Sequence, residues 1–413
     1  MRIRPIHHTF GPHVSRRFAL KADALLLTPW KWKETNHTEA LRDDIQRTFG
    51  GSAHLFASGR EGLLALLRSL NFEQGAEVII QGYTCVAVPN AVHTAGYTPI
   101  YADIDKETLN INPSSIQGRI SNRTRAIICQ HTFGIPADTE RLKEICIQHN
   151  LILIEDCAHV LPDTAGPGNI GEKGDYLMIS FGRDKAISGI AGGAIIDRKK
   201  IITNSLEAEE KNAVPLSKTT ITRLLMYAPV YYETRLAYGL LNIGKTLLFL
   251  CRKLGILVSV LSSEEKTGSM SPLIHKMPEP CAALAKMQLQ QLQQINDHRR
   301  ARTIQFLQSA QQKGWATPQA VKEDLPLQKF PLFVKNADSI RQKLKKKGIY
   351  LDDGWTGAAI CPRMVDQEAT NYIAGSCPHA EQVARSILSL PTHPTMTEKQ
   401  TKDLIQSLSS LVG

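Results

Sequence analysis

The segments Leu151-Ile-Leu-Ile-Glu-Asp-Cys-Ala-His159 and Tyr176-Leu-Met-Ile-Ser-Phe-Gly-Arg-Asp-Lys185 decide the fold expected of this chain. Each opens with four apolar residues without alternation, the pattern of a strand buried on both faces of a parallel sheet. Charged side chains follow each run, so Asp156 and Lys185 are expected at the carboxyl edge of two strands. Ligands of open α/β sheets bind at that edge.

Short apolar runs alternate with helical patterns around these segments. Strands are expected at 78–80, 99–102, 125–129 and 194–196, and helices at 38–47, 59–70, 87–93, 113–120 and 139–149. The alternation indicates an α/β protein with a mainly parallel, right-handed, doubly wound sheet.

A long helical pattern from Pro278 to Ala310 leads to a second region, with further elements at 327–334, through Lys347 and at 380–390. We expect a large domain over 1–275, and a linking helix with a smaller α/β domain over 276–413. The cleft between the two domains is the expected substrate entrance.

An acid on one strand and a lysine just past another form the pair that pyridoxal 5'-phosphate (PLP) chemistry requires. The lysine binds the coenzyme as a Schiff base, and the acid keeps the ring nitrogen protonated. The structural alternatives are an exposed lysine and a carboxylate that caps the next segment.

The chain resembles the DegT/DnrJ/EryC1/StrS family of PLP-dependent sugar aminotransferases, from about Leu41 to its end, interrupted by one insertion. Eight blocks in the family's order carry the resemblance: Ser58-Gly-Arg60, Asp103-Ile-Asp105, His131-Thr-Phe-Gly-Ile-Pro-Ala-Asp138, Glu155–His159, Gly174-Asp175, Ser180–Lys185, Gly192-Gly193 and Leu390-Pro-Thr-His-Pro394. The resemblance implies fold type I of the PLP-dependent transferases and a homodimer.

The resemblance also assigns roles. Lys185 is the expected catalytic and coenzyme-binding lysine, and Asp156, rather than the competing Glu155, is the expected partner of the ring nitrogen. His159 stands where the family places a hydrogen-bond donor to the phenolic oxygen. Ser180 is expected at the coenzyme phosphate.

The expected phosphate site also uses free N–H groups at a helix start, at Ser58-Gly59-Arg60. Arg60 replaces the family's usual threonine, so only its backbone contact carries over directly. Where the family often stacks an aromatic ring on the coenzyme, this chain has Cys85, with Tyr83 as the nearest ring.

A further departure concerns the asparagine with which the family reaches a neighbouring subunit's phosphate. Ile274 stands at that position, and His275 or Lys276 is a possible substitute.

The resemblance implies amino transfer, with glutamate as the expected donor and a nucleotide-linked keto-sugar as the expected acceptor, in glycan or polysaccharide biosynthesis. Substrate contacts are expected near Tyr83, His131, Arg183 and Trp355. One alternative is another PLP reaction on the same fold, such as sugar dehydration, although the family's dehydratases replace the lysine. Another is a membrane-associated binding or regulatory protein that holds PLP without turnover.

Composition excludes several other classes. The net charge of +10 over 413 residues lacks the basic runs interleaved with aromatics that nucleic-acid binding favours. Eight scattered cysteines without a C-x-x-C pair favour buried thiols in a reducing compartment over disulfides or a metal site. The N-terminus has no apolar signal region, so a cytoplasmic protein is expected.

The loop Gly166-Pro-Gly-Asn-Ile-Gly171 matches the G-x-G-x-x-G fingerprint of dinucleotide sites, but a strand rather than a helix is expected after it. We therefore predict no NAD site.

The insertion over residues 218–262 is rich in leucine, with basic residues such as Lys245, Arg252 and Lys253. No apolar run reaches the roughly 18 residues of a membrane-spanning helix. Two interpretations remain open: helices buried against the domain or a second subunit, and an interfacial segment on the cytoplasmic face of a membrane.

Overall fold

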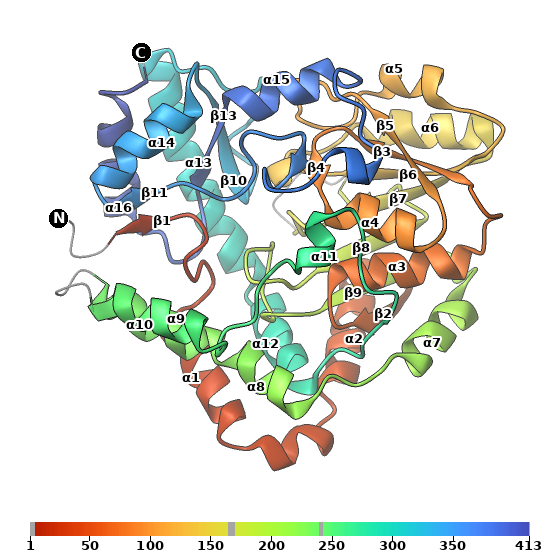
Figure 1. The fold of residues 1–413 in the computed structure, drawn as a ribbon, viewed down its shortest axis with the longest axis horizontal. Helices are drawn as coiled ribbons and strands as arrows, with labels where there is room; N and C mark the ends of the chain where they lie inside the picture. The colour runs from red at the N-terminus through yellow and green to blue at the C-terminus, as the bar shows by residue number, and fades with distance from the viewer. Residues whose placement is uncertain (1–4, 164–169, 239–242, 413) are drawn as a thin grey trace.

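A seven-stranded sheet forms the centre of the region expected as the large domain (Figure 1). The computed structural model describes residues 5–163, 170–238 and 243–412. The strand order of the sheet is β2 (Ser52–Phe56), β9 (Gly193–Asp197), β8 (Tyr176–Ser180), β7 (Ile152–Asp156), β6 (Thr124–Gln130), β3 (Glu77–Gln81), β5 (Thr98–Ala102). The strands pair in parallel except at β9, which runs antiparallel to both neighbours. The predicted α/β sheet is confirmed, and β2 was not predicted.

The apolar runs are buried on both faces, as their lack of alternation predicts. In β7, Leu153 packs on one face against Leu142, whereas Ile154 packs on the opposite face in a separate apolar cluster. The helices between the strands of the sheet are α3 (Gly59–Leu70), α4 (Ala87–Thr94), α5 (Pro113–Ile116) and α6 (Thr139–His149), while α2 (His37–Phe49) precedes β2 and α7 (Thr203–Asn212) follows β9. The helix expected at 113–120 ends early, and a 3-10 turn follows it.

The long helical pattern after the sheet is two helices, α12 (Glu279–Leu289) and α13 (Leu292–Lys313), with a short break between them. The region expected to form the smaller domain, called the small domain below, then follows as β10 (Lys329–Phe333), α14 (Ala337–Lys346), β11 (Ile349–Tyr350), β12 (Ile360–Cys361), α15 (Pro378–Ser386), β13 (Ile387–Pro391) and α16 (Glu398–Leu408). The segment 380–390 is thus a helix followed by a strand, which pairs with β10.

The two ends of the chain meet at the small domain. Strand β1 (Ile6–His7) pairs in parallel with β11, and helix α1 (Arg16–Leu26) then leads back under the large domain (Figure 1). Strand β12 pairs with β4 (Thr84–Cys85), which joins the small domain to the edge of the site.

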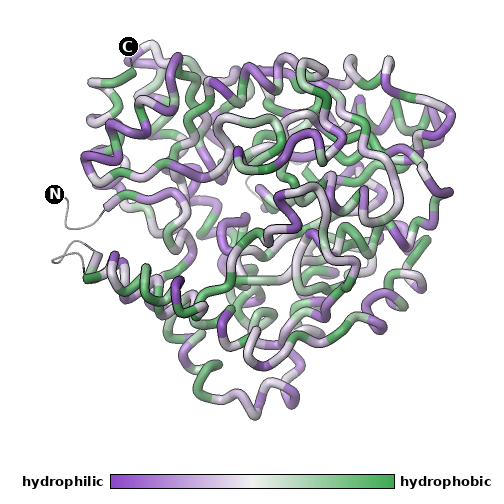
Figure 2. The backbone as a smooth tube through the Cα atoms, viewed as in Figure 1, coloured by the Kyte–Doolittle hydropathy of each residue, from purple (hydrophilic) through white to green (hydrophobic). Residues whose placement is uncertain are grey.

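The insertion forms α8 (Lys218–Leu225), α9 (Tyr227–Ala237) and α10 (Ile243–Lys253), before the short α11 (Ser263–Lys266). Helices α8 and α9 pack against α1, and α10 packs along α9. Hydropathy alternates along α10 (Figure 2), and its apolar residues Ile243, Leu247, Phe249 and Leu250 are exposed. In the described part of the chain, no helix is long and apolar enough to cross a membrane. Residues 166–169 of the expected Gly-rich loop 166–171 lie outside the described residues.

Candidate active site

A cavity of about 430 Å³ lies at the carboxyl ends of β7 and β8, beside the start of α3. Asp156 and Lys185, predicted to meet at this edge, both line it. So do Gly59, Ser180 and Cys85. The sheet edge thus brings together an acid, a lysine and a helix N-terminus.

Asp156 is the acid that faces this cavity. Burial raises the pKa of its carboxyl group, although the Ala158 N–H at 2.9 Å from Oδ1 and the nearby charge of Lys185 oppose the rise. A cationic ring nitrogen would stabilise the ionised form of such a carboxylate.

Glu155 points away from the cavity and is held by the core. Its carboxylate accepts hydrogen bonds from His131 Nε2 at 3.0 Å and from the main-chain N–H groups of Gly171, Lys173 and Gly174. Burial opposes ionisation, but the bonds from His131, Gly174 and Gly171 bring the pKa of Glu155 below its ordinary value. Of the two adjacent acids, only Asp156 has access to the cavity.

His131, which was expected near substrate, lies in this buried core. Its Nδ1 accepts the Ala137 N–H at 3.1 Å, so the neutral ring carries its proton on Nε2 and donates it to Glu155. A metal could in principle be shared by His131, Glu155 and Cys157, whose ligand atoms lie within 4.8 Å of one another. Because both Glu155 oxygens already accept hydrogen bonds, we interpret this cluster as part of the structural core and not as a metal site.

The start of α3 is shaped for a phosphate. Ser58 caps the helix by accepting the Glu61 N–H at 3.2 Å, and the first-turn N–H groups lack acceptors within a helix. A Cβ at Gly59 would lie 2.8 Å from the Ser180 Cβ, so only glycine fits between the helix and β8. These residues therefore fit a dianion held between backbone N–H groups and the Ser180 hydroxyl.

The Arg60 side chain is engaged elsewhere. Its guanidinium pairs with Glu265 and donates to the Val260 carbonyl at 3.1 Å. Arg183 is tied to the same segment, since it donates to the Val258 carbonyl at 2.9 Å and lies 4.5 Å above the Tyr227 ring. Both arginines thus fasten the insertion to the site.

The insertion consequently forms a wall of the cavity. Thr220 and Leu224 of α8 and the segment 258–260 line the same space as Lys185. Helices α8 and α9 are packed against the rest of the chain, which agrees with the first of the two interpretations of the insertion. Helix α10 keeps exposed apolar residues. The sequence did not predict that this segment reaches the cavity.

Tyr83 and Trp355 belong to a buried aromatic group behind the cavity, with Phe133 and His159. The Tyr83 hydroxyl donates to the Trp355 carbonyl at 2.6 Å, and their rings meet edge to face at 5.4 Å. Neither ring lines the cavity, whereas Cys85 does. No stacking ring is therefore supplied by Tyr83 in this arrangement.

His159 lies beside Trp355, with ring centroids 4.9 Å apart, and is buried without lining the cavity. Its Nδ1 accepts the Phe133 N–H at 3.2 Å, so a neutral ring carries its proton on Nε2. Burial, with the charges of Lys185 and Lys329, holds the pKa of His159 well below its ordinary value. His159 is therefore a neutral donor.

The segment around Ile274 lies against its own chain. Ile274 is buried, and the His275 N–H donates to Glu61 at 2.9 Å. His275 also lines the cavity, together with Leu273.

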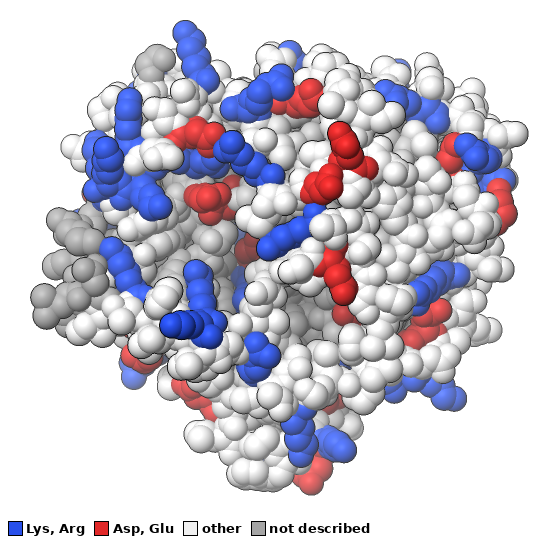
Figure 3. Space-filling view, viewed as in Figure 1, with Lys and Arg blue, Asp and Glu red and all other residues white. Residues whose placement is uncertain are grey.

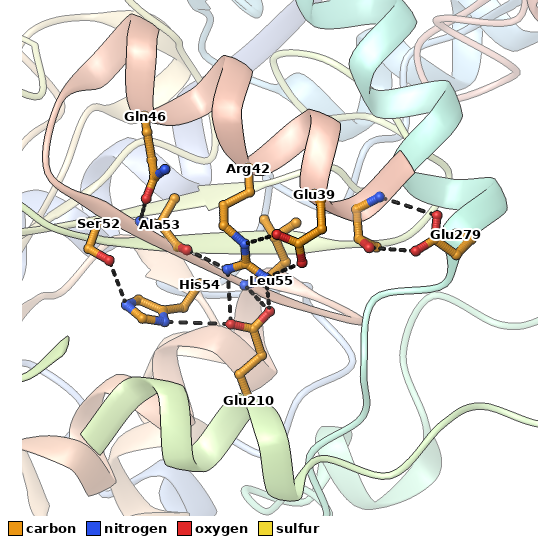
Figure 4. A network of polar contacts seen from close by, with 10 residues as sticks. Glu39, Arg42, Gln46, Ser52, Ala53, His54, Leu55, Glu210 and Glu279 are labelled. Atoms are coloured by element: carbon orange, nitrogen blue, oxygen red, sulfur yellow. Dashed lines mark hydrogen bonds and ion pairs between the residues drawn. The ribbon is translucent and has the colours of Figure 1, made fainter. Parts of the chain in front are cut away.

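A second cavity, of about 800 Å³, lies where β2 meets α2 and α7. Beside it, Glu210 accepts two bonds from Arg42 and one from the Leu55 N–H, and Glu279 accepts N–H groups at the start of α2 (Figure 4). Burial alone would raise the pKa of Glu210, but His54 and Arg42 bring it below its ordinary value. This network fastens β2, which sequence patterns missed, to the helices beside it.

Together the sheet order and the lysine, acid and helix N-terminus at its carboxyl edge define a PLP-dependent transferase of fold type I. The chain belongs to the DegT/DnrJ/EryC1/StrS aminotransferase family, which matches residues 24–216 and 250–409. The match omits residues 217–249, most of the α8–α10 insertion, and the first 23 residues. The predicted family is confirmed.

The chain is similar to several sugar aminotransferases. It is 35% identical over 146 residues to the GDP-perosamine synthase of Escherichia coli O157:H7, an alignment covering 35% of this chain and 40% of that protein. It is 25% identical over 355 residues to the UDP-N-acetyl-3-dehydro-alpha-D-glucosamine 3-aminotransferase of Acidithiobacillus ferrooxidans, covering 83% of this chain and 80% of that protein. The fold matches an aminotransferase from Psychrobacter cryohalolentis with a TM-score of 0.74, at 20% identity over 98% of both chains.

Proposed function

We propose that this protein is a PLP-dependent aminotransferase that moves an amino group from an amino acid, glutamate, to the ketone of a nucleotide-linked sugar. The observation that carries the proposal is the cavity that both Lys185 and Asp156 line, beside the N-terminus of α3. Names of relatives such as GDP-perosamine synthase support the sugar acceptor.

Each residue at the cavity has a definite task in such a reaction. Bound PLP supplies an electron sink that stabilises negative charge at the substrate carbon that carries the amino group. Lys185 holds the coenzyme and carries the proton between the two carbons that exchange the amino group. Asp156 stabilises positive charge at the ring nitrogen. His159 lies behind the cavity lining, and its Nε2–H is the donor that the family resemblance assigns to the phenolic oxygen. Gly59, with Ser180, holds the phosphate.

The insertion wall gives the acceptor site a composition of its own. Thr220, Leu224 and Val258 present a mixed apolar and hydroxyl surface, and Arg183 also lines the cavity, whereas Arg60 is paired with Glu265. Arg183 and the net charge of +10 would attract the phosphates of a nucleotide.

Half-reactions test this function. Protein loaded with PLP is mixed with glutamate, and absorbance follows conversion to the pyridoxamine form. Reconversion is then followed with a panel of nucleotide-linked keto-sugars, with the Lys185→Arg variant as control. We expect conversion by the wild type only. A wild type that binds PLP yet converts with no amino donor would favour the alternative of a silent PLP-binding protein.

We also propose that the protein acts as a homodimer, as its family resemblance implies. The His275 segment borders the cavity and is the place where a partner subunit would complete it. Light scattering of the purified protein tests this, and a monomer with full activity would refute it.

Finally, we propose a cytoplasmic protein that contacts an anionic membrane surface through α10. Ile243, Leu247, Leu250 and Leu254 recur at intervals of four, three and four, which places them on one stripe, and all are exposed. Basic residues accompany this stripe, and Lys and Arg side chains gather over α10 in the surface view (Figure 3). Exposed apolar residues beside basic ones are typical of interfacial helices.

Vesicle sedimentation tests this contact. Phosphatidylglycerol vesicles should pellet the protein, phosphatidylcholine vesicles should not, and the double variant Leu247→Glu/Leu250→Glu should stay in solution. Ile147→Glu/Ile373→Glu changes two apolar residues elsewhere that are even more exposed than Leu247 and Leu250, and is the control. Equal sedimentation of both double variants would refute the contact.

A further inference from the structure

Two buried side chains from distant parts of the chain hold the main-chain carbonyl of Lys185. His13, in the N-terminal leader, has its Nε2 2.8 Å from this oxygen and is 2% exposed. Arg299 of α13 donates to it from Nη2 at 3.2 Å and is 1% exposed. A carbonyl oxygen only accepts, so both side chains donate.

This arrangement fixes the tautomer of His13. Burial, together with the charge of Arg299, lowers the pKa of His13 to about 3, so the ring is neutral. The Gln288 Oε1 lies 2.8 Å from Nδ1. A neutral ring with its proton on Nε2 leaves Nδ1 as an acceptor, so this tautomer requires the Gln288 amide to be turned with its NH₂ group toward the ring. Gln288 of α12 is then the partner of the ring that donates to Lys185.

Arg299 is unusual for a buried arginine. Among the described residues, its Nε and Nη1 have no hydrogen-bond partner, and no carboxylate pairs with it. Burial lowers the pKa of Arg299 to about 9, so it remains charged at neutral pH. An unpaired buried cation reduces stability. Polar groups kept at such a cost are concentrated at functional sites.

The neighbouring peptide groups are held as well. Gln328, next to β10, donates to the Asp184 carbonyl, and the Lys185 N–H donates to Gly182 at 3.3 Å. The turn that carries the lysine is therefore pinned from the leader, the long helix and the small domain. The Lys185 side chain is left to move about a fixed main chain.

We propose that His13 and Arg299 are positioning residues for Lys185, and that the N-terminal leader is thereby part of this enzyme's active site. The leader lies before residue 24, where the family match begins. The proposal rests on the proposed function, because it assigns Lys185 the task of holding the coenzyme and moving the proton. A shift of about 1 Å in the main chain of a catalytic lysine would misorient its side chain and lower the reaction rate roughly 100-fold.

Three variants test His13. His13→Leu removes the donor, His13→Gln restores an N–H near the Nε2 position, and His93→Leu is the control. His93 of α4 is half-buried, and its Nδ1 lies 3.4 Å from a main-chain carbonyl oxygen outside the leader, that of Gly268. Each variant is loaded with PLP and compared with the wild type in melting temperature, coenzyme dissociation rate, absorbance maximum of the bound coenzyme, and kcat and KM of the glutamate half-reaction.

We expect His13→Leu to lower kcat by about 10- to 100-fold, with KM for glutamate little changed, faster coenzyme release and a shifted absorbance maximum. His13→Gln should recover most of kcat. His93→Leu should lower the melting temperature but leave kcat and the absorbance maximum as in the wild type.

Arg299→Met provides an independent test. Removing an unpaired buried charge should leave the melting temperature unchanged or higher, while kcat falls at least about tenfold. The positioning proposal is overturned if kcat follows the melting temperature in all four variants, or if His13→Leu and Arg299→Met keep wild-type kcat. A wild type that fails to bind PLP at all overturns the proposed function, and the positioning roles with it.

Discussion

The Lys329–Asp353 ion pair offers a quantitative test of how the small domain supports the site. Lys329 Nζ lies 3.0 Å from Asp353 Oδ2, and the two side chains are 2% and 0% exposed. The ammonium also lies 5.3 Å from the Trp355 ring and 5.6 Å from the Phe133 ring. Replacing Asp353 by Asn would leave a buried ammonium unpaired beside the aromatic group that contacts His159.

The expected loss follows from the structure in two ways. Burial opposes ionisation of Asp353, but Lys329, then His8 and Ser389, lower its pKa from 3.8 to about 2. At about 1.36 kcal/mol per pH unit, this corresponds to about 2 kcal/mol. Breaking a buried pair by removing one partner costs about 3–5 kcal/mol. We therefore expect Asp353→Asn to lower the free energy of unfolding by about 2–5 kcal/mol.

The assay is urea unfolding at pH 7 of the wild type, Asp353→Asn, Lys329→Met and the double variant Lys329→Met/Asp353→Leu. The double variant should lose much less than the sum of the single losses, because neither charge is left alone. Asp338→Asn breaks an exposed pair with Arg363, whose side chains are 53% and 67% exposed, and should cost less than about 1 kcal/mol. The reasoning would be refuted if Asp353→Asn lowered the free energy of unfolding by less than about 1 kcal/mol. It would also be refuted if the loss in the double variant equalled the sum of the two single losses.

The pH dependence has a definite sign. The folded pKa of Asp353 is below its unfolded value, so the contribution is complete above about 4 and is lost as the pH falls toward 2. The difference between wild type and Asp353→Asn should therefore shrink over that interval in acid unfolding experiments.

Three other changes follow from the site. Asp156→Asn should lower kcat by about 100- to 1,000-fold in the glutamate half-reaction, since the charge at the ring nitrogen is lost; a kcat within a factor of about three of wild type would count against the assigned role. Glu155→Gln should cost about 1–3 kcal/mol in urea unfolding at pH 7, because buried N–H groups lose their charged acceptor, and the loss should diminish below the ordinary pKa of a glutamate; equal losses at pH 7 and pH 3 would be inconsistent with this. Arg183→Met should detach the Val258 segment and speed its cleavage by a protease relative to wild type, and unchanged cleavage would show that the arginine does not hold the wall.

The sequence predicted the sheet edge because its signal is local. An apolar run ending in charges specifies a strand and the place where ligands meet it, and Asp156, Lys185, Gly59 and Ser180 do line one cavity. The family and the α/β fold are confirmed. The chemical roles of these side chains stay predictions that the experiments above test.

Other features depend on long-range contacts that no local pattern reveals. His131 lies in the core because Glu155 accepts from it, and Arg60 turns to Glu265. The contacts of Lys185 with His13 and Arg299 join residues 172 and 114 positions apart. A histidine in a polar leader carries no signal of burial, so this support could be found only in three dimensions.

The most direct test of the central claim is borohydride reduction of the PLP-loaded protein, followed by peptide mapping. The account predicts one modified peptide, with the coenzyme fixed to the Lys185 side chain, and no labelling when Lys185 is replaced by arginine. An unlabelled wild type, or a label on another lysine such as Lys329, would contradict it.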